Sequence, residues 1–173
     1  HWGSDRAELV VVYGRRRVGK TSLLRRFCEG RSHAFWVASL SVEAVLRRSW
    51  TETLWQSRHP DSTGPGFTYE SWERAFVALA EDVPPSERTV VVVDEFPYLV
   101  ASEPSVPSLL QKVWDEYLQH TRLMLVLCGS HSGMMEEEVL AYRAPLFGRR
   151  TGQIRLGPLP PIAVAEFFPE YTV

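Results

Sequence analysis

The residues best suited to chemistry lie in the segment GRRRVGKT, residues 14–21. Gly14 and Gly19 allow backbone torsions that turn successive N–H groups toward a single anion. The ammonium group of Lys20 would neutralise the outer phosphates of a nucleotide, and the hydroxyl of Thr21 could ligate magnesium. The segment follows an apolar run and precedes a helical pattern, which is the context that a phosphate-binding loop requires.

The other residues of this segment, and Ser22 after it, are also predicted to bind the nucleotide. The full set of predicted nucleotide-binding positions in the segment is Gly14, Arg15, Arg16, Arg17, Val18, Gly19, Lys20, Thr21 and Ser22. The three consecutive arginines either hold polyphosphate or a partner, or form a solvated basic loop, and the sequence leaves both open. The alternative for the whole segment is a glycine turn that Lys and Thr follow by chance.

An acidic pair, Asp94 and Glu95, follows the apolar run VVVV of residues 90–93. Charge beside such a buried strand is costly unless it is paired or bound to metal. We therefore expect Asp94 to hold magnesium and Glu95 to act as the base that polarises the attacking water. The alternative is a helix cap or a surface acid.

A further polar position, Ser130, follows the apolar run LMLVLC of residues 123–128. In the expected sheet its strand lies between the strands that lead to the phosphate loop and to Asp94. The Ser130 hydroxyl would then face the terminal phosphate and orient the attacking water. A strand-to-helix turn with Ser130 or Ser132 as its N-cap explains the same residues, so both interpretations stay open.

These positions need a scaffold of alternating strands and helices. We expect strands at 9–13, 33–38, 90–93, 123–128 and 152–156, and helices at 21–29, 42–58, 69–81, 106–120, 134–142 and 161–168. This alternation predicts a three-layer α/β fold with a parallel sheet. The adjacent Asp and Glu suggest the P-loop division whose five-stranded sheet has the order 5-1-4-3-2.

Composition bounds the remaining possibilities. With 173 residues the chain is expected to form one domain. Its 19 Lys and Arg against 21 Asp and Glu give a net charge of −2, so no global field favours nucleic acid or anionic lipid. No apolar run reaches the roughly 18 residues needed to cross a bilayer. Two cysteines without zinc spacing, expected to be buried, and the lack of a secretory leader favour a cytoplasmic location.

Taken together, these motifs resemble the archaeal-type ATPases of the AAA+-related STAND group. The resemblance rests on GRRRVGKT, VVVVDEFPYL, LMLVLCGSHSGMMEEE and APLFGRRTGQIRLGPL in this order, and spans residues 9–168. It implies a P-loop core that is followed in the family by a helical lid and often a winged-helix region. We accordingly expect residues 1–173 to be an ATPase core truncated at both ends, without its lid and effector regions.

The resemblance also assigns roles position by position. It matches Gly14, Gly19, Lys20 and Thr21 to the phosphate loop, Asp94 and Glu95 to the acidic pair and Ser130 to the polar sensor position. His131 departs from the second serine that similar proteins commonly carry there.

Two positions near the end of the chain have a role only through this resemblance. Arg149 or Arg150, in FGRR, lies where AAA+ relatives carry an arginine directed at a neighbouring subunit's γ-phosphate. The alternative is an arginine that pairs with a nearby surface carboxylate. Pro158, after Gly157, resembles the element that begins the lid and touches nucleotide, and a plain turn is equally compatible.

The functional expectation is an ATPase that binds ATP and Mg²⁺ and couples nucleotide state to effector regions outside this chain. The catalytic residues would be Lys20, Glu95, Ser130 and Arg149, and the metal ligands Thr21 and Asp94. A regulatory module that holds ATP or ADP with little turnover is the competing class. A DNA-processing motor is a third, with DNA bound through the absent C-terminal regions. The partners expected are ATP or ADP, with homo-oligomers left open and no membrane.

Overall fold

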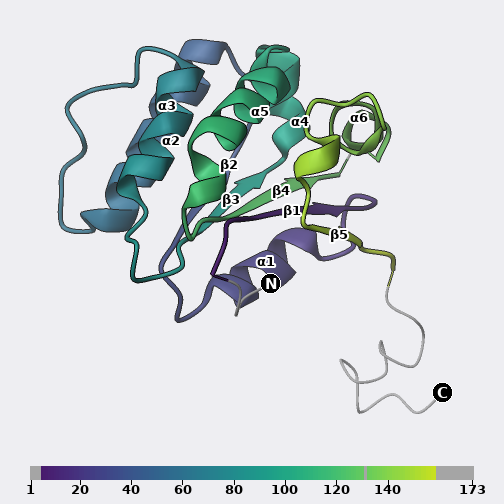
Figure 1. Ribbon diagram of the computed structural model, residues 1–173, viewed down its shortest axis with the longest axis horizontal. Helices are drawn as coiled ribbons and strands as arrows, with labels where there is room; N and C mark the ends of the chain where they lie inside the picture. Colours follow the sequence, from purple (N-terminus) through teal and green to yellow (C-terminus); the bar gives the residue numbers. More distant parts are fainter. Residues whose placement is uncertain (1–4, 131, 159–173) are drawn as a thin grey trace.

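The computed structural model describes residues 5–130 and 132–158. Its centre is a five-stranded sheet in the order β2-β3-β4-β1-β5, in which every pairing is parallel (Figure 1). The strands are β1 (Glu8–Tyr13), β2 (His33–Val37), β3 (Val90–Asp94), β4 (Met124–Gly129) and β5 (Gly152–Arg155). Read from the other edge this is the expected order, so the predicted α/β P-loop architecture is confirmed.

Helices cover both faces of the sheet. On one face lies α1 (Lys20–Cys28), and on the other lie the helices that connect later strands (Figure 1). Those other helices are α2 (Glu43–Arg58), α3 (Trp72–Asp82), α4 (Phe96–Ser102) and α5 (Val106–Glu116). A helical turn, α6 (Ser132–Met135), continues as a π-helical turn, Glu136–Leu140, and a 3₁₀ turn at Phe147–Arg149 precedes β5.

The three central strands are buried on both faces, which explains their continuous apolar sequence. Alternate residues of β1 enter two separate cores. Val11 joins the larger core beneath α2, α3 and α5, whereas Val12 joins the smaller core against α1. The larger core includes mutually packed aromatic rings, with the centroids of Trp36 and Trp50 5.3 Å apart.

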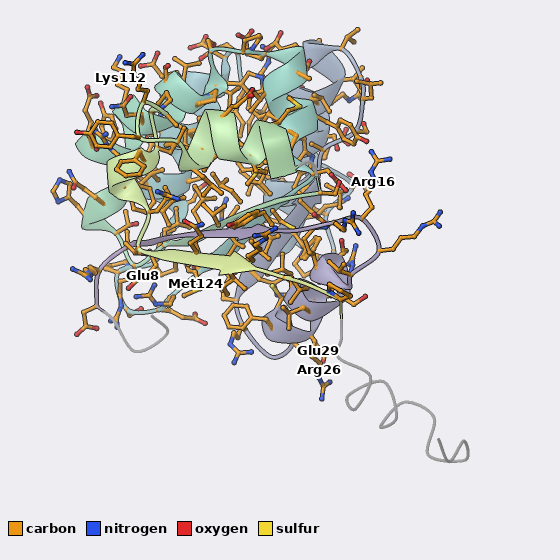
Figure 2. All side chains as sticks on the ribbon, turned by 90° about the vertical axis from the view of Figure 1, so that its right-hand side faces the viewer. Glu8, Arg16, Arg26, Glu29, Lys112 and Met124 are labelled. Atoms are coloured by element: carbon orange, nitrogen blue, oxygen red, sulfur yellow. The ribbon has the colours of Figure 1, made fainter. Side chains whose placement is uncertain are left out.

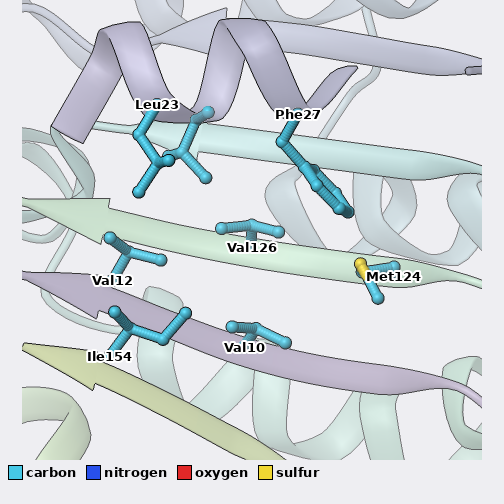
Figure 3. A pocket seen from close by; sticks show the side chains of 8 residues that line it. Val10, Val12, Leu23, Phe27, Met124, Val126 and Ile154 are labelled. Carbon is cyan, nitrogen blue, oxygen red and sulfur yellow. The ribbon is translucent and has the colours of Figure 1, made fainter. Parts of the chain in front are cut away.

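An apolar cavity of about 260 Å³ lies between α1 and the sheet (Figure 3). Leu23 and Phe27 point from α1 toward the side chains of the strands. The cavity is lined by Val10, Val12, Leu23, Leu24, Phe27, Met124, Val126 and Ile154. Because every lining side chain is apolar, this space offers no group for a phosphate or a metal ion.

The expected strands are confirmed to within one residue at either end. The first three expected helices are also present, but the segment 106–120 ends its α-helix at Glu116 and continues as a 3₁₀ turn, Leu118–His120. The prediction of a single helix at 134–142 is wrong, because α6 and the π-helical turn take its place. The expected helix at 161–168 lies outside the described residues.

One helix, α4, was not expected. It begins immediately after the acidic pair, with Pro97 in its first turn, where a proline is favourable because the N–H it lacks would be unpaired there. Both cysteines, Cys28 and Cys128, are free and buried, as expected. Among the described residues, no helix has the length and apolar character required to cross a membrane.

Candidate nucleotide-binding site

The predicted functional residues meet at the carboxyl edge of the sheet. There β1 ends next to β4, with Tyr13 opposite Gly129, and β3 ends on the other side of β4. The phosphate loop, the acidic pair and Ser130 follow these three neighbouring strands directly. Figure 2 shows Arg16, in the loop, at the end of the sheet opposite Glu8, the first residue of β1. Ligands of open α/β sheets bind at this edge.

Backbone oxygens of the loop between β1 and α1 bind the side chain of Lys20, the first residue of α1. The buried Lys20 ammonium donates hydrogen bonds to the backbone oxygens of Gly14, at 2.9 Å, and Arg15, at 2.8 Å. Gly19, at φ 92°, begins α1 in a left-handed conformation. Gly14 has φ 150°, and a Cβ built there would lie 2.1 Å from the carbonyl oxygen of Leu156. Leu156, the residue after β5, thus requires glycine at the start of the loop.

Thr21 and Asp94 form the centre of the predicted metal site. The Thr21 hydroxyl donates to Asp94 Oδ2 at 2.6 Å, and the other carboxylate oxygen accepts from the backbone N–H of Glu95 at 3.0 Å. Asp94 is 2% exposed, so its charge is held by these donors rather than by water. Two hard oxygen atoms on adjacent elements fit Mg²⁺, which binds few protein ligands and takes the rest from phosphate and water.

In residues 5–130 and 132–158 there is no group of three or more His, Cys, Asp or Glu side chains placed to hold a metal ion.

Glu95 and Ser130 are joined directly. The Ser130 hydroxyl lies 3.0 Å from Oε1 and 2.8 Å from Oε2 of Glu95, and donates to this carboxylate. Glu95 has φ 54°, a left-handed conformation that is strained for a residue with a long side chain. Such strain persists where the surroundings enforce it, and it is often found at functional sites. Here it turns the chain from β3 into α4 and leaves the carboxylate beside β4.

These groups surround a polar cavity of about 510 Å³. Its lining residues are Arg16, Arg17, Gly19, Lys20, Thr21, Ser22, Glu95 and Ser130. Positive charge from the loop faces the carboxylate of Glu95 across this space. The cavity can therefore take an anionic ligand next to a group able to accept a proton.

Buried Cys128, two residues before Ser130, takes no part in this chemistry. Burial and the negative charge of Asp94 raise the pKa of its thiol well above the usual value. A thiol that stays protonated is a poor nucleophile and a poor metal ligand.

The structure brings together most of the predicted site residues. Gly14, Arg15 and Asp94 contribute through backbone oxygens or hydrogen bonds rather than by lining the cavity, and Val18 does not line it. Pro158 is exposed, lies two residues past Leu156, and is also not among the lining residues.

Arg149 lies apart from this cavity. It precedes β5, at the amino edge of the sheet, and pairs with Asp115 of α5. Its Nε and one terminal nitrogen donate to the two carboxylate oxygens at 3.0 and 2.7 Å. This hydrogen bonding raises the pKa of the guanidinium above its usual value. Arg150 instead donates to Gln153 and lies over the ring of Phe147.

One contact at the site was not expected from the sequence. A terminal nitrogen of Arg16 donates to the hydroxyl of Tyr98, on α4, at 2.6 Å. The segment DEFPYL contained the signal, because a helix that starts at Phe96 places Tyr98 in its first turn, near Glu95. Without α4 in the predicted fold, that proximity could not be inferred.

The fold and this edge define the class of protein, an α/β protein with a P-loop core. The chain belongs to the family described as an ATPase domain predominantly from Archaea, which it matches over residues 2–172. The expected resemblance to archaeal-type ATPases is thereby confirmed.

The curated relatives come from one archaeon. An uncharacterised protein of Methanocaldococcus jannaschii is 36% identical over 169 residues, which cover 96% of this chain and 35% of the relative. An uncharacterised ATP-binding protein of the same organism is 50% identical over 30 residues, which cover 17% of this chain and 51% of that protein. The chain thus spans about a third of the length of the first of these relatives.

Solved structures share the fold. The Walker-type ATPase of Pyrococcus abyssi superposes with a TM-score of 0.65 at 24% identity, covering 94% of this chain and 52% of that one. The Aeropyrum pernix ORC1 protein in complex with DNA has a TM-score of 0.59 at 15% identity, covering 94% of this chain and 44% of that one.

Proposed function

We propose that this chain binds ATP with Mg²⁺ at the carboxyl edge of its sheet and hydrolyses it to ADP and phosphate. The observation that carries the proposal is the convergence of Lys20, the Thr21–Asp94 pair and the Glu95–Ser130 pair around one polar cavity. Membership of an ATPase family supports nucleotide binding, and the site residues support the chemistry.

Each residue has a distinct task in this proposal. The N–H groups of the loop and the Lys20 ammonium bind the phosphates, while Thr21 and Asp94 hold the magnesium ion. Magnesium bound there would neutralise charge on the phosphates. Glu95 accepts a proton from water as the water oxygen bonds to the γ-phosphorus, and the bond from that phosphorus to the β–γ bridging oxygen breaks. Ser130 orients the base or the water.

The nucleotide cycle would act as a switch for regions outside this chain. Loss of the γ-phosphate removes the contacts that hold the surrounding loops in one arrangement, so the conformation of neighbouring elements would depend on which nucleotide is bound. We place this switch in the cytoplasm. Homo-oligomers fit the same scheme, with Arg149 reaching the γ-phosphate of a neighbouring subunit only if it leaves Asp115.

DNA is a further partner to test, because two of the solved structures with this fold are described as complexes with DNA. A DNA-processing role predicts that double-stranded DNA binds the full-length protein and increases its rate of ATP hydrolysis. If DNA neither binds nor changes the rate, the DNA-processing role is excluded and the switch remains.

A second candidate is a regulatory module that holds nucleotide with little turnover. The Ser130 hydroxyl favours it, because it lies within hydrogen-bond distance of both oxygens of Glu95 and so occupies the carboxylate that an attacking water would have to contact. In this case nucleotide binding would be tight and the hydrolysis rate of the wild type would be close to that of a variant without the base.

One pair of variants tests the proposal. Lys20→Ala should abolish ATP binding, measured by calorimetric titration of the full-length protein with Mg-ATP. Glu95→Gln should retain binding and lower the rate of phosphate release by about 10²- to 10⁴-fold, because the amide cannot accept the proton. A Glu95→Gln variant that hydrolyses ATP like the wild type would contradict the assignment of the base.

A control separates the loss of Lys20 from a general loss of positive charge. Lys112, on α5, is exposed and pairs with Glu73, far from the loop at the other end of the molecule (Figure 2). Lys112→Ala should bind ATP with wild-type affinity. Equal binding by Lys20→Ala and Lys112→Ala would remove the phosphate loop from the proposal.

A further inference from the structure

Arg16 is held in place by a residue from another element. It is the third residue of the phosphate loop, and its side chain lines the polar cavity. Its guanidinium donates to the hydroxyl of Tyr98 at 2.6 Å, across 82 positions of sequence. An exposed arginine without such a partner would sample many rotamers, so this contact selects one direction for it.

Tyr98 lies in the same turn of chain as the proposed base. Its backbone N–H donates to the carbonyl oxygen of Glu95 at 2.9 Å, and both residues belong to the start of α4. The Arg16 side chain therefore bridges the phosphate loop and the turn that carries Glu95. In the proposed function, Glu95 must face the phosphorus that water attacks, which is the last one of the triphosphate.

Lys20 lies elsewhere in the loop. It is buried, and its ammonium is enclosed by the carbonyl oxygens of Gly14 and Arg15, whereas the Arg16 side chain is exposed and reaches toward α4. The two cations thus approach the cavity from different directions. Since Arg16 is tied to the turn that carries the proposed base, it is placed beside the phosphorus that water attacks, which belongs to the terminal phosphate.

We propose that Arg16 binds the terminal phosphate of a nucleoside triphosphate and that Tyr98 is the residue that positions it. Arg16 then distinguishes triphosphate from diphosphate. This inference rests on the proposed function, since it assumes that a nucleotide occupies the cavity.

The chemistry of the two side chains suits these roles. A guanidinium has five N–H donors in a planar fork, and the hydrogen bond to the Tyr98 oxygen uses one of them, so the fork has further donors for phosphate oxygens. The Tyr98 hydroxyl orients the arginine through a hydrogen bond rather than through an ion pair. A carboxylate in the same place would compete with the phosphate.

Binding of ADP and of the non-hydrolysable triphosphate AMP-PNP, each with Mg²⁺, tests the assignment in the full-length protein. Arg16→Ala should weaken AMP-PNP binding by about 10- to 100-fold, the usual effect of losing a hydrogen bond to a charged group, and should weaken ADP binding by less than about threefold. Arg16→Lys should recover part of the preference, because it restores charge but not the fork.

Tyr98→Phe keeps the ring and removes only the hydroxyl. We expect it to lower the preference for AMP-PNP over ADP by about three- to tenfold, and to have no further effect when Arg16 is already alanine. A tyrosine with a merely structural role would lower both affinities, and would do so equally in either background.

Arg26→Ala is the matched control for charge. Arg26 is also an exposed arginine, but it lies on α1 and pairs with Glu29 at the end of the helix remote from the cavity (Figure 2). Its removal should leave the ratio of the two affinities unchanged.

The outcomes separate this inference from the proposed function. If the wild type binds neither nucleotide, the proposed function itself fails. If the wild type binds both and Arg16→Ala weakens both equally, only the role of Arg16 in recognising the terminal phosphate is overturned. Binding of AMP-PNP by Arg16→Ala at wild-type affinity would overturn it too.

Discussion

Two cavities border the same helix, and they differ in almost every property. The one at the N-terminus of α1 is polar, about 510 Å³, and lined by charged and hydroxyl side chains together with Gly19. The one beneath the flank of α1 is apolar, about 260 Å³, and lined by Leu, Val, Phe, Met and Ile. Lys20 and Thr21 contribute to the first, and Leu23, Leu24 and Phe27 to the second.

The difference shows how one short helix separates chemistry from stability. Its first turn presents N–H groups without partners within the helix, and these favour an anion. Its flank meets the sheet through apolar side chains, whose removal from water stabilises the fold. We therefore expect substitutions at the polar cavity to change nucleotide binding, and substitutions at the apolar cavity to change the free energy of unfolding alone.

The largest effect is expected at Gly14, where a substitution should change both nucleotide binding and the free energy of unfolding. Gly14→Ala would place a Cβ 2.1 Å from a backbone oxygen of Leu156, which cannot move without disturbing the pairing of β5 with β1. We expect the free energy of unfolding to fall by about 3 kcal/mol, through overpacking and backbone strain. Nucleotide binding should weaken more than roughly tenfold, because the carbonyl oxygen of Gly14 holds Lys20. Urea unfolding and nucleotide titration measure the two effects.

Gly30→Ala provides the comparison for this variant. Gly30 also has a positive φ, 70°, but a Cβ there would meet nothing within 4 Å. Its cost should be about 1 kcal/mol from backbone conformation, with nucleotide binding intact. Equal losses at Gly14 and Gly30 would show that the contact with Leu156 is unimportant.

Leu24→Ala tests the apolar cavity. Leu24 is 5% exposed, and truncation should lower the free energy of unfolding by about 3 kcal/mol, since it enlarges a space that is already incompletely filled. Nucleotide affinity of the folded variant should stay within about threefold of the wild type, because Leu24 lines the apolar cavity and is not among the residues that line the polar one.

Leu23→Ala refines the same test. Leu23 lines the same cavity but is 46% exposed, so its truncation should cost only about 1 kcal/mol. A large loss of nucleotide affinity in either leucine variant would contradict the expectation that the apolar cavity affects stability alone.

The features that could be predicted from the sequence are those that a few neighbouring residues determine. Four consecutive valines predict a strand buried on both faces, and glycines with Lys20 and Thr21 predict an anion-binding turn, because a few neighbouring residues determine each outcome. The order of the strands followed from assigning the Asp94–Glu95 pair to a known division of P-loop folds, and the structure agrees.

What could not be predicted depends on contacts between distant segments. The hydrogen bond between Arg16 and Tyr98 requires that α4 exist, and α4 is too short for its apolar spacing to be distinguished from a loop. Similarly, the π-helical turn at Glu136–Leu140 replaces a regular helix although its sequence has helical spacing, and apolar spacing alone does not distinguish the two geometries.

The smallest expected effect concerns Arg149, which lies outside both cavities. Its ion pair with Asp115 is partly exposed, with 30% and 43% of the two side chains accessible, so the pair should contribute at most about 1 kcal/mol. Arg149→Ala and Asp115→Asn should each lower the free energy of unfolding by that amount or less, and the double variant should lose no more than either alone. The coupling between them, measured by urea unfolding, should decrease in about 1 M salt, where charges on the surface are screened within roughly 3 Å. Additive losses in the double variant would mean that the two side chains act independently, leaving Arg149 available to another partner, such as a neighbouring subunit. A double variant that loses no more than either single variant would mean that Arg149 must first leave Asp115 before it can contact the γ-phosphate of a neighbouring subunit.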